Sequence, residues 1–112
     1  MSDAPTIRIK GKPYDYPASS KLGDAALINN LSTDNTAIGS LTLNNNTFGA
    51  DNTAIGAQAL EDNDGNNNTA VGVQALQNSG IGNENTATGV DALFYNTSGN
   101  SNNAIGNEAL LN

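Results

Sequence analysis

The middle of the chain reads Asn52-Thr53-Ala54-Ile55-Gly56-Ala57-Gln58-Ala59-Leu60, and close variants of this phrase recur along most of its length. Each copy keeps the pattern Asn-Thr-Ala-Ile-Gly-x-x-Ala-Leu with few changes. The five good copies begin at Asn35, Asn52, Asn68, Asn85 and Asn102, which are 17, 16, 17 and 17 residues apart. An eroded copy begins at Ser19. A repeat of this regularity predicts a solenoid in which each copy forms one coil.

Each repeat opens with residues that favour a β-strand. An Ala precedes a β-branched residue in most copies, as in Ala54-Ile55, and two successive side chains of a strand point to opposite faces. The second half ends in Ala-Leu, and seven or eight turn-forming residues follow it. The segments between glycines are too short for stable helices. We therefore expect two short strands and two turns per coil, with about six coils stacked in parallel at about 4.8 Å into a rod of roughly 29 Å.

Two columns of the repeat are expected to be structural. A Gly occupies the same place in every copy, which predicts a corner where the backbone needs positive φ or lacks room for a Cβ. These coil corners are Gly39, Gly56, Gly72, Gly89 and Gly106. The Asn that opens each copy stacks on its neighbours, so we expect its side-chain amide to hydrogen-bond along the rod and to satisfy local backbone groups.

The apolar residues on the two faces of the first strand need two different surroundings. Only 4% of the 112 residues are aromatic, and a domain of this size buries little surface on its own. We expect the Leu column to fill each coil. The sequence does not settle whether the Ala column or the Ile column faces outward, and we assign the Ile column to a core between subunits. That column, the predicted trimer core, consists of Ile38, Ile55, Val71 and Ile105. The alternative is that every apolar column packs within its own chain.

The repeat resembles the head repeat of YadA-type trimeric adhesins, which is also found in bacteriophage fibre and decoration proteins. The resemblance covers residues 19–112 and rests on the five copies of Asn-Thr-Ala-Ile-Gly-x-x-Ala-Leu. It implies an all-β fold, a left-handed parallel β-roll, in which three chains pack side by side as a homotrimer. The same module serves on bacterial surfaces and on virions, so the function must be argued from other features.

Charge divides the chain into two parts. The first 21 residues hold all four basic residues and two acids, a net charge of +2, whereas residues 22–112 hold nine acids and no base, a net charge of −9. An acidic rod repels nucleic acid and anionic membranes, and it stays soluble when displayed densely. We therefore expect neither nucleic acid nor a membrane as a partner.

Residues 1–18 form a separate extended arm, and residues 19–112 form the repeat domain. The segment Thr6-Ile7-Arg8-Ile9-Lys10 alternates as a strand does, and two prolines hold residues 13–17 extended. We expect this arm to add a strand to a larger partner and to place tyrosines in its pockets. The expected docking residues are Ile7, Arg8, Ile9, Lys10, Lys12, Tyr14 and Tyr16. The alternative is a cap that folds over the first coil and protects its edge.

Catalytic and metal chemistry find little support in the sequence. The chain has no His and no Cys, which removes the usual nucleophile–base pairs and zinc sites. Three acids share the turn at residues 61–64, but exposed acids are usually solvated, and these offsets miss the EF-hand pattern. We expect no enzyme, no cofactor and no metal site, and the sequence leaves calcium at this turn open.

The aromatic residues of the repeat domain are Phe48, Phe94 and Tyr95, all in turns between copies. One interpretation is a binding patch. The other is that these rings cover coil edges or fill gaps between protomers.

These features together predict a small trimeric virion protein whose arm docks on a capsid or tail protein and whose acidic roll projects outward. Residues 1–5 lead into no apolar signal segment, and the sequence shows no stalk heptads and no membrane anchor. We therefore expect synthesis in the host cytoplasm and a place in the virion. We favour a capsid decoration or cement protein, because an arm and six coils are short for a receptor-reaching fibre. The alternatives are a short tail or head fibre that binds a host-surface glycan, and a bacterial surface adhesin head.

Overall fold

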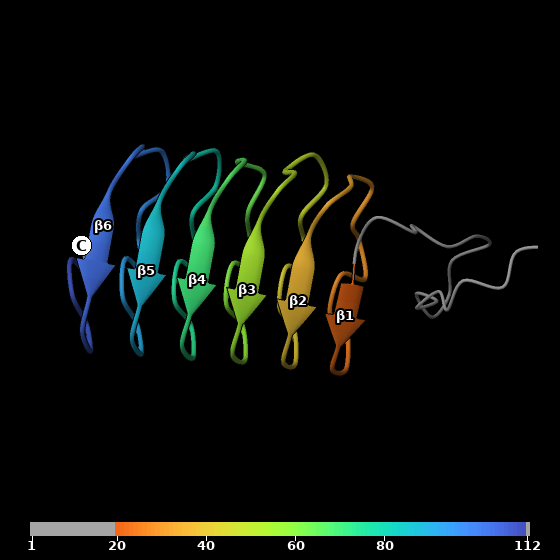
Figure 1. The fold of residues 1–112 in the computed structure, drawn as a ribbon, viewed down its shortest axis with the longest axis horizontal. Helices are drawn as coiled ribbons and strands as arrows, with labels where there is room; N and C mark the ends of the chain where they lie inside the picture. Colours follow the sequence, from red (N-terminus) through yellow and green to blue (C-terminus); the bar gives the residue numbers. More distant parts are fainter. Residues whose placement is uncertain (1–19, 112) are drawn as a thin grey trace, which may run out of the picture.

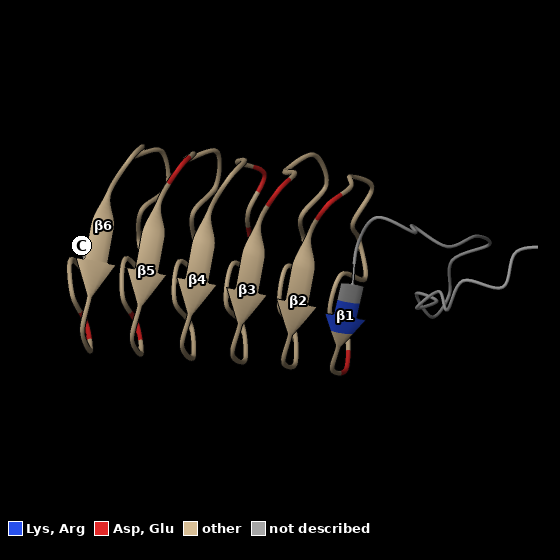
Figure 2. Cartoon of the chain, viewed as in Figure 1, with Lys and Arg blue, Asp and Glu red and all other residues tan. Residues whose placement is uncertain are grey.

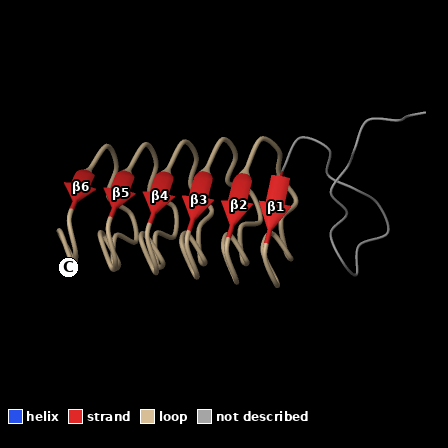
Figure 3. Cartoon of the chain, turned by 60° about the horizontal axis from the view of Figure 1, so that its bottom comes forward, coloured by secondary structure: helices blue, strands red, loops and turns tan. Residues whose placement is uncertain are grey.

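The computed structural model describes residues 20–111, which form a parallel β-solenoid (Figures 1 and 3). Within this range each coil begins with a three-residue strand: β1 (Ser20–Leu22), β2 (Thr36–Ile38), β3 (Thr53–Ile55), β4 (Thr69–Val71), β5 (Thr86–Thr88) and β6 (Asn103–Ile105). The strands form one parallel sheet in chain order, and equivalent residues of neighbouring repeats lie opposite each other, as Ala54 does to Ala37 and Ala70. An all-β parallel solenoid is therefore confirmed, with about five complete coils rather than six.

Each strand points one side chain inward and the next outward. The Ala of strands β2 to β6 is buried, whereas Ile38 and Ile55, one position later, are 39% and 38% exposed. A small inward side chain lets the opposite wall of the coil approach closely. That wall contributes a buried Leu in each complete coil, as the pattern predicts: Leu27, Leu43, Leu60, Leu76 and Leu93. The core of the solenoid thus contains a column of Ala side chains and a column of Leu side chains, and each of the coils of β2 to β5 contributes to both.

The second half of each repeat is not a strand, so the expectation of two strands per coil is wrong. After the corner glycine every second residue has positive φ, as at Gly56 (126°), Gln58 (62°) and Leu60 (51°). The segment still bonds from coil to coil, because the N–H of Gln58 donates to the Ser40 carbonyl (2.8 Å) and that of Leu60 to the Ala75 carbonyl (3.0 Å). A left-handed non-glycine residue costs about 1–2 kcal/mol. Burial of the Leu60 side chain, worth about 1.5–3 kcal/mol, offsets this cost.

The corner glycines lie where successive coils touch through their backbones. Gly56 has a φ of 126°, and a Cβ added there would lie 2.6 Å from the carbonyl carbon and oxygen of Gly72. Both the dihedral angle and the close approach therefore require glycine. The same geometry occurs at Gly23, Gly39, Gly72 and Gly89. At each of them φ is positive, and an added Cβ would lie within 3 Å of the glycine carbonyl of the next coil. Gly106 has the same φ, at 129°, in the last coil.

A second column of glycines lies in the linking turns, where the backbones of successive coils approach each other as closely as at the corner glycines. The repeated phrase alone does not predict this column. It consists of Gly49, Gly65, Gly82 and Gly99. A Cβ added at Gly65 would lie 1.8 Å from the Gly82 carbonyl oxygen. The 16- or 17-residue spacing of these glycines, which matches that of the corner glycines, is the signal that would have revealed the column.

The Asn that opens each repeat is buried and forms a ladder along the solenoid, as predicted. The Asn52 Oδ1 accepts a hydrogen bond from the N–H of Asn68 (2.8 Å), and the Asn68 Oδ1 accepts one from the N–H of Asn85 (2.9 Å). The Nδ2 atom of Asn68 donates in turn to the Gly82 carbonyl of its own repeat (2.8 Å). These side chains satisfy buried backbone groups that the short strands leave unpaired, so their structural role is confirmed.

A second ladder of buried polar side chains runs through the linking turns. The Asn63 Nδ2 donates to the Asn46 Oδ1 (3.1 Å), and the Ser79 hydroxyl donates to the Asn63 Oδ1 (2.7 Å). The Asn68 Nδ2 also donates to the Asn63 Oδ1 (3.1 Å), which joins the two ladders. A buried polar network is stable only when its members are satisfied, so these ladders fix the register of one coil on the next.

Candidate interaction surfaces

The outer face of the sheet carries one column of side chains in register from strand to strand. Its members, in order along the rod, are Leu22, Ile38, Ile55, Val71, Thr88 and Ile105. Five of the six are apolar, and the exposed fraction reaches 65% at Leu22 and 73% at Ile105. The alternative that every apolar column packs within its own chain therefore does not hold for this one. The four predicted trimer-core residues all lie in this column, on the surface of the chain.

A second exposed apolar column lies just beyond the corner glycines. Val73 and Val90, which directly follow Gly72 and Gly89, are 43% and 44% exposed. They lie in the neighbouring coils of β4 and β5. Exposed apolar side chains at equivalent places of neighbouring coils make this surface a candidate for contact with another protein.

Charged side chains avoid the outer face of strands β2 to β6. Figure 2 shows that the acids lie in the turns at the two edges of the coils, and that the only basic residue among residues 20–111, Lys21, lies in β1. The sequences of β2 to β6 contain no charged residue. An uncharged apolar strip between two acidic edges can be buried without the desolvation of charge.

The acids of the turn at residues 61–64 serve as hydrogen-bond acceptors between coils. The Asp64 Oδ1 accepts from the N–H groups of Thr47 and Phe48, at 2.7 and 3.1 Å. The Glu61 Oε2 accepts from two glutamine side chains, at 2.9 and 3.0 Å. Among residues 20–111 no group of three or more potential ligand side chains is placed to hold a metal ion. The geometry of this turn is thus explained by coil stacking.

The seven predicted docking residues of the arm, from Ile7 to Tyr16, lie outside the described residues, as does the proposed cap. The interaction surfaces described here belong to the repeat domain alone.

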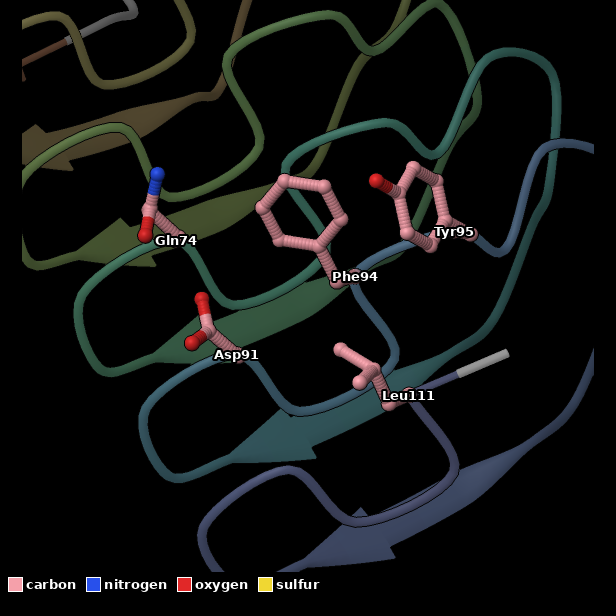
Figure 4. Close-up of a pocket in the computed structure, with 5 residues that line it drawn as sticks. All are labelled: Gln74, Asp91, Phe94, Tyr95 and Leu111. Atoms are coloured by element: carbon pink, nitrogen blue, oxygen red, sulfur yellow. The ribbon is translucent and has the colours of Figure 1, made fainter.

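The aromatic residues occupy two separate places. Phe48 is 74% exposed, whereas the rings of Phe94 and Tyr95 meet edge to face, with centroids 4.5 Å apart and an interplanar angle of 73°. This pair lines a depression of about 290 Å³ together with Gln74, Asp91 and Leu111 (Figure 4). Gln74, Asp91 and Leu111 belong to three successive coils, those of β4, β5 and β6. The sequence alone does not predict that they line a common depression.

No family model, no curated protein and no solved structure matches this chain. The fold is therefore assigned from the repeat in the sequence and from the parallel stacking of its strands. Within residues 20–111, no helix is long and apolar enough to cross a lipid bilayer.

Proposed function

We propose that this chain is a structural rod that assembles with two further copies, side by side, through the outer faces of its strands. The observation that carries the proposal is the in-register apolar column of Ile38, Ile55, Val71 and Ile105, on strands that hold no charge. At about 25 cal/mol per Å², burying the exposed part of one such isoleucine contributes on the order of 1–2 kcal/mol. Several such residues in each of three chains amount to a large part of the net stability of a small domain.

The resemblance to YadA-type head repeats supports this arrangement. It implies left-handed coils and a threefold axis parallel to the rod, around which an outward column such as Ile55 packs against its two symmetry mates. Closed symmetry of this kind buries the column and leaves none of it open for further growth. The acidic edges of the coils then face solvent.

The role that we infer for the trimer is display on a virion, as a capsid decoration or cement protein. In this proposal the basic arm, with Tyr14 and Tyr16, holds the trimer on a capsid or tail protein, and the acidic rod projects outward. The negative charge of residues 22–112 supports it, because like-charged rods resist association when crowded on a particle. A short tail or head fibre is the second candidate, and the depression beside Phe94 and Tyr95 favours it. The copy number in purified particles separates the two: a decoration protein follows the capsomers, and a fibre follows the few tail or portal positions.

Replacing Ile55 with Asp is expected to abolish the trimer. Each chain would then place a carboxylate beside the axis, and burial of unpaired charges is among the most destabilising changes. In sedimentation experiments the variant should have the mass of one chain or be unfolded. The matched control is Gln58→Asp in the same coil, because Asp91 already occupies the equivalent position with nearly the same φ, 59° against 62°. Equal trimer content in both variants would contradict the assignment of the strand face.

Removing the arm is expected to separate attachment from folding. A chain that starts at Ser19 keeps every strand, so it should give the same far-ultraviolet circular dichroism spectrum per coil, but it should not bind particles that lack the protein. Changing Arg8, Lys10 and Lys12 to Gln should weaken attachment and reduce its dependence on salt, since salt screens charge pairs. Replacing Tyr14 and Tyr16 with Ala should weaken it equally at all salt concentrations. Attachment of the shortened chain with full affinity would assign docking to the rod.

A further inference from the structure

In the coils of β3 and β4, polar side chains in the turn after the corner glycine pair in the same way. The residue two positions after the glycine donates to the residue three positions further on: the Gln58 Nε2 to the Glu61 Oε2 (2.9 Å), and the Gln74 Nε2 to the Gln77 Oε1 (3.1 Å). The Gln77 Nε2 also donates to the Glu61 Oε2 (3.0 Å), which links the two coils. In the coils of β3 and β4 these side chains thus form one connected network.

The coil of β5, like those of β1, β2 and β6, lacks this pairing. Asp91 occupies the place of Gln58 and Gln74, and its partner three positions later is Phe94, which has no polar side-chain atom. The Asp91 Oδ1 is consequently buried without a hydrogen-bond partner, the only side-chain atom in this condition among residues 20–111. An unsatisfied buried acceptor destabilises the folded chain. Native proteins contain few such atoms, and an unexplained one points to a missing partner.

Asp91 also lines a depression whose walls are both aromatic and polar, although its unpartnered Oδ1 atom is buried. Figure 4 shows Phe94 and Tyr95 side by side, with Asp91 and Gln74 on the other side of Phe94 and Leu111 below. The Tyr95 side chain is 56% exposed, so its ring and hydroxyl are available to a ligand. At about 290 Å³ the depression lies at the small end of the range for ligand sites, roughly 300–1,000 Å³.

We propose that this depression is a binding site for a neutral saccharide, with Phe94 and Tyr95 packing against the apolar face of one sugar ring. A pyranose ring presents C–H groups on its faces and hydroxyl groups around its edge. The Asp91 carboxylate accepts hydrogen bonds from those hydroxyls, and the Gln74 amide can both donate and accept. Aromatic rings beside a few convergent polar groups are what a site of this chemistry requires.

The negative charge of the rod favours the binding of neutral saccharides over acidic ones. Asp91 stands among the nine acids of residues 22–112, which have no base to balance them. A sugar that carries a carboxylate or sulfate would bring a further negative charge beside Asp91, with no Lys or Arg among the residues that line the depression. The site is therefore specific for uncharged sugars. It lies in the turns and not on the strand face, so it does not depend on the proposed trimer.

The test is a titration of the full chain with methyl glycosides of glucose, galactose, mannose and N-acetylglucosamine, and with glucuronic acid, followed by the amide NMR signals of residues 91–95. We expect at least one neutral glycoside to shift these signals, with a Kd in the millimolar range, about −4 kcal/mol, and glucuronic acid to leave them unchanged. Tyr95→Asn and Asp91→Ala should each weaken binding by at least about tenfold. Both variants should fold, because Asn78 and Ala25 occupy the equivalent places in other coils.

The control is Phe48→Ser, which removes an aromatic ring that is even more exposed but lies outside the depression. It should bind the glycoside as the parent does. The proposal is overturned if no neutral glycoside shifts residues 91–95, if only glucuronic acid or a cation such as arginine amide does so, or if Tyr95→Asn binds as tightly as the parent. None of these results bears on the trimer, because the oligomeric state is measured separately.

Discussion

Replacing Gly56 with Ala is expected to lower the free energy of unfolding by about 2–6 kcal/mol. The added Cβ would lie 2.6 Å from the carbonyl carbon and oxygen of Gly72, and a backbone group in the middle of a stack cannot move aside. The strained dihedral angle contributes about 1–3 kcal/mol of this loss, and the overpacking of the stack contributes about as much again. Urea denaturation, followed by circular dichroism, measures the change.

Gly106→Ala is the matched control for this prediction. Gly106 has nearly the same φ, 129° against 126°, but the nearest neighbour of an added Cβ is the Ala109 side chain at 3.8 Å. This variant should therefore show only the cost of the dihedral angle, about 1–3 kcal/mol. If both variants lose the same free energy, the close contact between coils is not what requires glycine in this column.

Asn68→Ala is expected to lower the free energy of unfolding by about 2–6 kcal/mol. The substitution leaves the Gly82 carbonyl and the Asn85 N–H buried without the partners that Asn68 provides at 2.8 and 2.9 Å, and each lost partner costs about 1–3 kcal/mol. For a domain of this size the thermal midpoint should fall by more than about 10 °C. Differential scanning calorimetry gives both quantities.

Asn78→Ala serves as the control for the ladder. Asn78 lies in the same coil and is half-buried, but its side chain makes no hydrogen bond to any of residues 20–111. Its replacement should change the midpoint by no more than about 2–4 °C, the effect of about 0.5 kcal/mol. A midpoint as low as that of Asn68→Ala would mean that Asn in these coils acts through backbone conformation and not through the ladder.

The sequence predicts the architecture well because the spacing of the repeat determines which residues of neighbouring coils lie opposite each other. A spacing of 16 or 17 residues, an invariant Gly and an Ala that precedes a β-branched residue are sufficient to predict parallel stacking and the Asn ladder. They do not predict the conformation of the second half. A second strand is the expectation at Ala59-Leu60, but Leu60 adopts a φ of 51°, which is sterically disfavoured for a non-glycine residue and which burial of its side chain stabilises.

The candidate surfaces were predictable to different degrees. Alternation along a strand places Ala54 and Ile55 on opposite faces, so the two candidate columns could be named in advance, but alternation does not settle which of them faces outward. The depression beside Tyr95 could not be, because it depends on which side chains of three successive coils come together. Its one sequence signal is the substitution of Phe94 for the polar partner that Glu61 and Gln77 provide in earlier coils. That signal can be interpreted only when the hydrogen bonds between the side chains of these turns are known.

The measurement that tests the central claim most directly is the mass of the protein in solution. Sedimentation equilibrium at micromolar concentration should give three times the 11.4 kDa chain mass, and the Ile55→Asp variant should not. The apolar column on the strand face would then be buried between chains, as the proposed assembly requires. A parent protein that is folded, strand-rich and has the mass of a single chain would contradict the side-by-side trimer.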